Sequence, residues 1–223
     1  NFETIAAAVE EGRGMFDTIR KVVLYLLSNV FVEMSIILVS ILFRLPLPLT
    51  PLQILWINLI DDGLPSLALT IDPPDRELMR RKPQAKGTPI VNQYLRLLIG
   101  LISSVTVVLV FGVYVWALWN GVSVAYARTL VFAMVGMSSL IYVFSCRSLT
   151  RSFITEGIRN PWLVAAVGIG ALLQIVAIYH PWGRDVFETY PLGINDWALV
   201  LGLGVVLIGM IEGVKTAFLW QRK

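Results

Sequence analysis

Charged residues and cysteine are scarce in this chain of 223 residues. Asp, Glu, Lys and Arg together make up 15% of it, whereas soluble domains contain about 25%. The only cysteine is Cys146, which excludes a disulfide framework within the chain and a site built from several thiolates. The low charge argues against an ordinary soluble domain.

Apolar residues are correspondingly abundant, at 57% of the chain with a mean hydropathy of +0.74. A helix needs about 20 mostly apolar residues to cross the hydrocarbon core of a bilayer. Long apolar runs of this kind predict an all-α membrane protein, a bundle of six transmembrane helices embedded in the lipid bilayer. The predicted spans are 22–43, 49–71, 94–119, 129–144, 162–179 and 197–217.

The basic residues are distributed asymmetrically about these spans. If the N-terminus is cytoplasmic, all but three of the 18 Lys and Arg residues fall on the cytoplasmic side. Such an excess predicts orientation, so we expect an integral, multi-pass protein of the cell membrane with both termini in the cytoplasm. The net charge of +3 is accounted for by this rule and does not indicate nucleic-acid binding. The three on the other side are Arg44, Arg128 and Arg184.

The chain divides by composition into two predicted parts. Residues 1–21 have an amphipathic pattern and are expected to form a cytoplasmic stalk segment, with Gly12 and Gly14 as candidate breaks. Residues 22–223 are expected to form the six-helix membrane domain. The prolines of 45–51 predict a tight turn, so the first two spans should be an antiparallel hairpin.

Three carboxylates interrupt the first two spans, neither of which contains Lys or Arg. Asp61 and Asp62 lie in the second span and Glu33 in the first. A charge at this depth costs roughly 2.5–3.5 kcal/mol on insertion scales, so such residues are rare and usually functional. Asn29 precedes Glu33 by four residues, and Asn58 precedes the two aspartates by three and four. These spacings place each amide on the same helix face as an acid.

Gly63 and Pro65 follow the aspartates at once. Pro65 removes a backbone donor, so we expect local unwinding over 61–65 that frees carbonyl oxygens for a cation. Calcium takes about 6–8 oxygen ligands, several of them carboxylates. The pattern predicts a cation site near the bilayer midplane. The predicted ligands are Glu33, Asn58, Asp61, Asp62 and Asn29.

Polar groups in membrane helices have a second interpretation, in which they only hold helices together. The spacing of Gly209 and Gly213 is typical of such helix packing, and Glu212 with Lys215 favours a salt bridge. Interhelical bonding alone leaves three neighbouring acids without compensating charge. We therefore favour the cation site over a non-transporting scaffold.

Four segments carry a family resemblance. They are 1–13 (NFETIAAAVEEGR), 55–65 (LWINLIDDGLP), 72–74 (DPP) and 144–148 (FSCRS). These segments closely resemble the C-terminal membrane half of P-type cation-transporting ATPases, in the branch that contains calcium and sodium/potassium pumps. The resemblance covers essentially the whole chain. It implies cation-ligand roles for Glu33, Asn58 and Asp62.

The chain departs from the pattern of this family at two places. The family typically has Asn three residues before the first-span acid, where this chain has Val30, and Asn29 lies one residue earlier. Asp61 stands where the family commonly has Thr.

The resemblance implies one part of an ATP-driven pump, most simply for calcium. The aspartyl-phosphorylation motif DKTGT is absent, so we expect ATP and magnesium to act only through domains outside this chain, which would not hydrolyse ATP by itself. Its expected partners are the bilayer, the cation and the N-terminal part of the same pump. Alternatives are a proton, sodium or potassium pump and, in another class, a stand-alone six-helix channel or exchanger.

Overall fold

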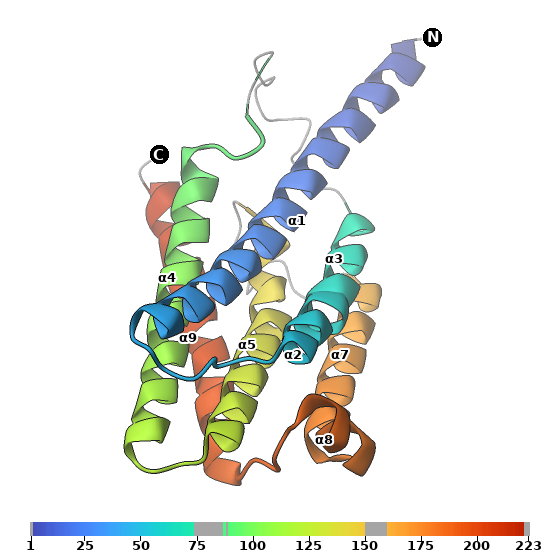
Figure 1. Ribbon diagram of the computed structural model, residues 1–223. Helices are drawn as coiled ribbons and strands as arrows, with labels where there is room; N and C mark the ends of the chain where they lie inside the picture. The colour runs from blue at the N-terminus through green and yellow to red at the C-terminus, as the bar shows by residue number, and fades with distance from the viewer. Residues whose placement is uncertain (1, 74–86, 88, 150–159, 221–223) are drawn as a thin grey trace.

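The computed structural model describes residues 2–73, 87, 89–149 and 160–220, and every regular element in these ranges is helical (Figure 1). The all-α membrane bundle predicted from the sequence is confirmed. Five helices, α1, α4, α5, α7 and α9, are long and apolar enough to cross a membrane. In chain order the elements are α1 (Phe2–Leu42), α2 (Pro51–Trp56), the π-helix η1 (Ile57–Asp62), α3 (Gly63–Thr70), α4 (Gln93–Trp119), α5 (Val124–Cys146), α7 (Pro161–Tyr179), α8 (Pro181–Phe187) and α9 (Ile194–Trp220).

The second predicted span is built from three consecutive pieces, α2, η1 and α3. Thr50 caps its start, since its side chain accepts from the backbone of Gln53 and the Gln53 side chain accepts in return from Thr50. The irregular stretch is a π-helix over Ile57–Asp62, so the expected unwinding over 61–65 was placed too late in the chain. Pro65 disturbs the hydrogen bonding of the turn before it, because the missing donor lies four residues after its acceptor.

Helix α1 continues without interruption through 41 residues. Gly12 and Gly14 do not break it, which corrects the expectation from sequence. Its N-terminal part extends beyond the ends of the other helices in Figure 1. The division into a stalk at 1–21 and a membrane domain at 22–223 therefore has no break in secondary structure at its boundary, and it stays a prediction.

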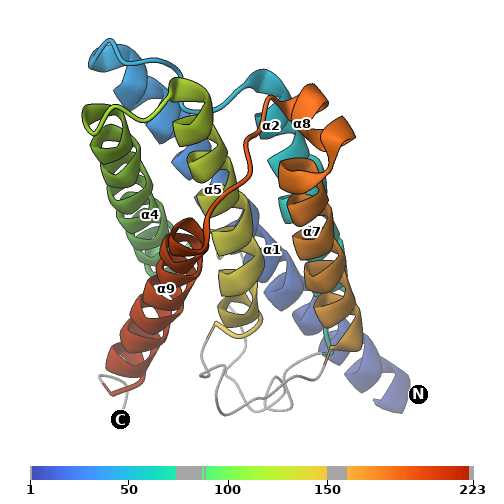
Figure 2. The same cartoon turned by 90° about the horizontal axis from the view of Figure 1, so that it is seen from below.

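Helix α5 is the centre of the bundle. In its most apolar stretch 89% of the residues are buried within the protein, against 39% in α1 and α4 and 28% in α7 and α9. It packs against α9, α4, η1, α7 and α1, and Figure 2 shows it between α4 and α9 on one side and α7 on the other. A residue of α5 that faces η1 is consequently enclosed by protein.

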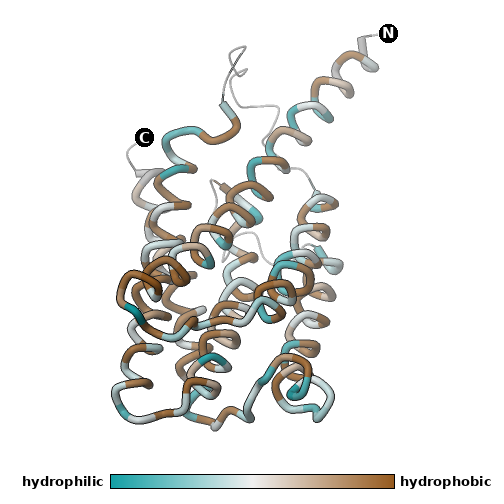
Figure 3. The backbone as a smooth tube through the Cα atoms, in the orientation of Figure 1, coloured by the Kyte–Doolittle hydropathy of each residue, from teal (hydrophilic) through white to brown (hydrophobic). Residues whose placement is uncertain are grey.

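Apolar residues dominate the middle of the helices and polar ones gather toward their ends (Figure 3). The start of α1 and the end of α9 lie at the same end of the bundle in both ribbon views. This arrangement agrees with an even number of crossings.

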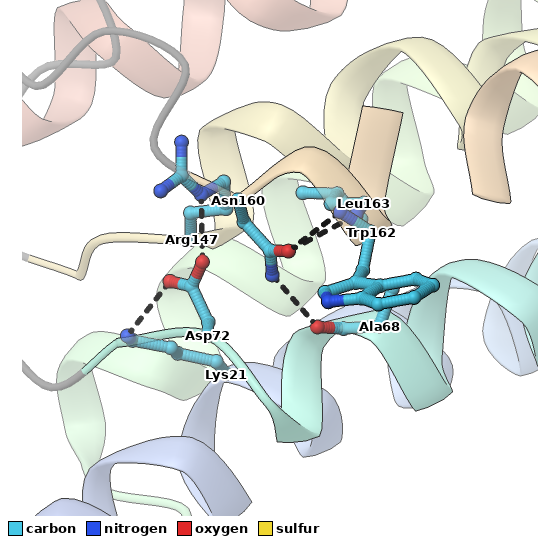
Figure 4. Close-up of polar contacts among 7 residues, drawn as sticks. All are labelled: Lys21, Ala68, Asp72, Arg147, Asn160, Trp162 and Leu163. Atoms are coloured by element: carbon cyan, nitrogen blue, oxygen red, sulfur yellow. Dashed lines mark hydrogen bonds and ion pairs between the residues drawn. The ribbon is translucent and has the colours of Figure 1, made fainter. Parts of the chain in front are cut away.

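A buried ionic cluster closes the end of the second span (Figure 4). Asp72, just after α3, lies 3.6 Å from the Nζ of Lys21 on α1 and 3.1 Å from the Nε of Arg147 at the end of α5. Next to it, the Asn160 amide donates to the carbonyl of Ala68 on α3 at 2.9 Å. We call Lys21, Asp72 and Arg147 the inner clasp, because it ties α3 to α1 and α5.

The segment 180–195, expected to be an outer loop, contains the short helix α8. His180 caps it by accepting from the backbone of Trp182 at 3.3 Å. Its last residue, Phe187, packs edge-on against Trp56 at 4.7 Å and accepts from the Gln53 amide at 2.9 Å. Helix α8 thus holds the start of the second span.

Close helix packing occurs at different glycines from those expected. A methyl group at Gly209 or Gly213 would meet no atom within 4 Å in the described part of the chain. At Gly204, by contrast, it would lie 2.6 Å from Ile141, and at Gly170 it would lie 2.9 Å from Leu140. Helices α9 and α7 therefore pack closely against α5 at Gly204 and Gly170.

Candidate cation site

Two reciprocal hydrogen-bonded pairs join α1 to η1. The amide of Asn29 on α1 donates to the Oδ1 of Asp62 at 2.8 Å. The amide of Asn58 on η1 donates to both carboxylate oxygens of Glu33, at 3.0 and 2.8 Å. Each helix therefore supplies one amide and one acid, and four of the five predicted residues meet across a single helix interface.

These four side chains differ in how deeply they lie. Asn29, Glu33 and Asp62 are buried, with 3%, 6% and 2% of their surfaces exposed. Asn58 is exposed at the edge of the bundle, where its amide also donates to the carbonyl of Ile54 at 2.9 Å. The Glu33–Asn58 pair consequently forms the open side of the group and Asn29–Asp62 the closed side.

Two tyrosines orient the closed side. The Tyr142 hydroxyl on α5 donates to the Oδ1 of Asn29 at 2.6 Å, which leaves the amide nitrogen to face Asp62. The Tyr25 hydroxyl donates to the backbone carbonyl of Asp61 at 2.9 Å and lies 3.5 Å from Asp62 Oδ1. Tyr25 shares its helix face with Asn29. Tyr142 could not be predicted from local spacing, since it lies 113 residues further along the chain.

Asp61 lies apart from these pairs. Its carboxylate is directed toward α5, where its Oδ2 would lie 2.3 Å from a methyl group placed on Gly136. Within the described residues, both of its carboxylate oxygens are buried and make no hydrogen bond, and no three His, Cys, Asp or Glu side chains are grouped closely enough to hold a metal ion. A single ligand shell that includes all five residues stays a prediction.

A buried glutamine borders the Asp61 side. Gln174 on α7 accepts from the indole nitrogen of Trp56 at 2.9 Å and donates to the carbonyl of Phe132 at 3.1 Å. It connects the second span, α5 and α7. Sequence reasoning missed it, because one amide in an apolar helix carries no spacing signal.

Other polar groups have structural partners. The hydroxyls of Ser138 and Ser139 donate to carbonyls of their own helix, at 3.1 and 2.9 Å. Glu212 and Lys215 form the expected ion pair at 2.9 Å, and Lys215 also donates to the carbonyl of Ser145. The Glu212–Lys215 pair thus links α9 to the end of α5.

The group of four offers oxygen ligands in a setting that suits a hard cation. Carboxylate and amide oxygens are the ligands that calcium prefers in proteins. Ionisable residues within membrane helices are candidates for functional sites. The first two spans bring no Lys or Arg of their own to offset these acids.

Comparison with known proteins gives a consistent result. Residues 46–217 match the family model described as cation transporting ATPase, C-terminus. The chain is 37% identical over 96% of its length to a calcium-transporting ATPase of Bacillus subtilis, and 34% identical over 93% to a probable cation-transporting ATPase F of Mycobacterium bovis. It is also 34% identical over its whole length to calcium-transporting ATPase type 2C member 2 of Mus musculus.

The chain spans about a quarter of the length of these relatives, 23–24% of each. The family model matches well over half of the chain, and the helical bundle agrees with an integral membrane protein. The chain belongs to the family of cation-transporting ATPase C-terminal regions.

Proposed function

We propose that this chain is the membrane transport portion of an ATP-driven calcium pump and that it holds part of the ion site between α1 and η1. The observation that carries the proposal is the reciprocal pairing of Asn29 with Asp62 and of Glu33 with Asn58. Two acids face one another's amides, one on the candidate membrane span α1 and the other on the predicted second span. The relatives named as calcium-transporting ATPases support calcium as the cargo.

A cation enters this site by replacing amide donors. In this structure the amide N–H group of Asn58 donates a hydrogen bond to the Glu33 carboxylate. Calcium bound to the Glu33 carboxylate takes the place of that donor, and rotation of the Asn58 amide then offers its oxygen as a further ligand. Asp62 and Asn29 act in the same way on the closed side, and Asp61 adds a third acid to the polar interior.

The energy for transport comes from outside this chain. We propose that ATP and magnesium act in the N-terminal part of the pump and that α1, continuous from residue 2 to residue 42, relays the motion to the site. In this proposal residues 1–21 form the stalk and both termini lie in the cytoplasm of a cell-membrane protein. The inner clasp supports it by joining α1 to the end of the second span.

The test is ATP hydrolysis by the purified full-length protein as a function of calcium. We expect calcium to stimulate hydrolysis, and Asp62→Asn to remove the stimulation. Asp185→Asn, which neutralises an exposed acid on α8, should behave as wild type. Stimulation by sodium, potassium or protons with no response to calcium would replace the calcium assignment, and ion flux without any ATP dependence would favour the channel or exchanger.

A further inference from the structure

Helix α5 packs against η1, and Gly136 of α5 lies against Asp61. A methyl group on this residue would lie 2.3 Å from Asp61 Oδ2 and 3.1 Å from its Cγ. Contacts below 3.0 Å to a Cβ atom essentially never occur in proteins. The Asp61 carboxylate therefore occupies space that exists only because residue 136 has no side chain.

Both partners of this contact are buried within the protein. Gly136 lies in the most enclosed helix of the bundle, and close-packed interiors transmit a displacement instead of absorbing it. On the other side, the Tyr25 hydroxyl holds the backbone carbonyl of Asp61. A methyl group on Gly136 would also lie 2.9 Å from the amide nitrogen of Gln174, which donates to the carbonyl of Phe132.

We propose that Gly136 is a positioning residue for the cation site: it admits the Asp61 side chain against α5 and thereby sets where η1 lies. Asn58 and Asp62 are on the same short π-helix as Asp61, so a displacement of Asp61 moves both of them relative to Glu33 and Asn29. The proposal rests on the proposed function, because the affected group is the calcium site. In this proposal an acid at position 61 fits only when residue 136 is glycine.

The test is a double-mutant comparison in the full-length protein. Gly136→Ala should raise the calcium concentration that half-saturates ATP hydrolysis at least fivefold, with the maximal rate within twofold of wild type. In an Asp61→Ala background, where the clashing carboxylate is absent, the same change should alter half-saturation less than twofold. An equal effect in both backgrounds would overturn the proposal, since the contact responsible would then be with Gln174.

Gly170→Ala is the matched control. It places a methyl group 2.9 Å from the apolar Leu140 of the same helix α5. It should lower the midpoint of thermal inactivation and leave calcium half-saturation unchanged, whereas an equal calcium shift would show that any crowding of α5 suffices and would overturn the proposal.

The thermal midpoints of the same variants separate this inference from the proposed function. If calcium does not stimulate the wild-type protein, the proposed function fails. The pairing of positions 61 and 136 is still measurable, because Gly136→Ala should lower the thermal midpoint more with Asp61 present than with Asp61→Ala. Equal reductions in the two backgrounds would contradict the inference.

Discussion

The Tyr25 hydroxyl donates to the backbone carbonyl of Asp61 at 2.9 Å. Pro65, four residues later, has no N–H with which to bond that carbonyl. A side chain of the first span thus satisfies the acceptor that the proline of the second span leaves open. The bond helps to set the position of η1 along α1. That position in turn aligns the two amide–acid pairs across the helix interface.

Tyr25→Phe should destabilise the protein and weaken calcium binding together. It leaves a buried carbonyl without its donor, at a cost of about 1–3 kcal/mol. We expect a lower midpoint of thermal inactivation and a several-fold higher half-saturating calcium concentration. Tyr114→Phe is a matched control, because Tyr114 donates to the carbonyl of Pro46 at 2.8 Å, far along α4 from the site. A calcium shift of equal size in both variants would contradict a specific role for Tyr25.

Asn29→Ala should weaken calcium binding by about tenfold, the effect of about 1.4 kcal/mol. The Asn29 amide lies 2.8 Å from Asp62, and in the proposed calcium-bound state it supplies an oxygen ligand that alanine lacks. Tyr142→Phe should have a smaller effect of the same sign, since it only releases the orientation of Asn29. The double variant should match Asn29→Ala alone, because both changes act through one amide. Additive effects in calcium titrations would show that Tyr142 acts by another route.

Asp72→Asn should strongly destabilise the inner clasp. Removing one member of a buried ion pair typically costs about 3–5 kcal/mol, because the remaining charge stays buried without its counter-charge. Here two cations, Lys21 and Arg147, lose the same carboxylate. We expect a large fall in the thermal midpoint that high salt does not reproduce in the wild-type protein, since buried pairs are poorly screened. The surface change Asp185→Asn should stay within about 0.5 kcal/mol of wild type.

The spans were predictable because long apolar runs are a strong signal. The expected span 162–179 became Pro161–Tyr179, and 94–119 became Gln93–Trp119. Helix α8 was not predictable in this way, because a segment of seven residues that begins with a proline shows no clear periodicity. The π-helix begins before the irregular stretch expected from sequence, for a related reason. The sequence shows which residue lacks a backbone donor, but the surrounding packing decides which turn of the helix takes up the irregular hydrogen bonding.

The candidate site was predictable in part. Spacing of three or four residues placed Asn29 with Glu33 and Asn58 with Asp62, and the structure brings these four together. Asn29, although one residue earlier than the amide usual in the family, still reaches Asp62. Neighbouring residues on a helix point in different directions, which is why Asp61 faces Gly136 on α5 while Asp62 faces Asn29 on α1. Tertiary contacts of this kind leave no trace in local sequence.

Equilibrium binding of radioactive calcium to the purified full-length protein tests the central claim most directly. We predict saturable binding in the wild-type protein, lost in Glu33→Gln and in Asp62→Asn and retained in Asp185→Asn. Calcium binding that survives both Glu33→Gln and Asp62→Asn in correctly folded protein would contradict a site between α1 and η1.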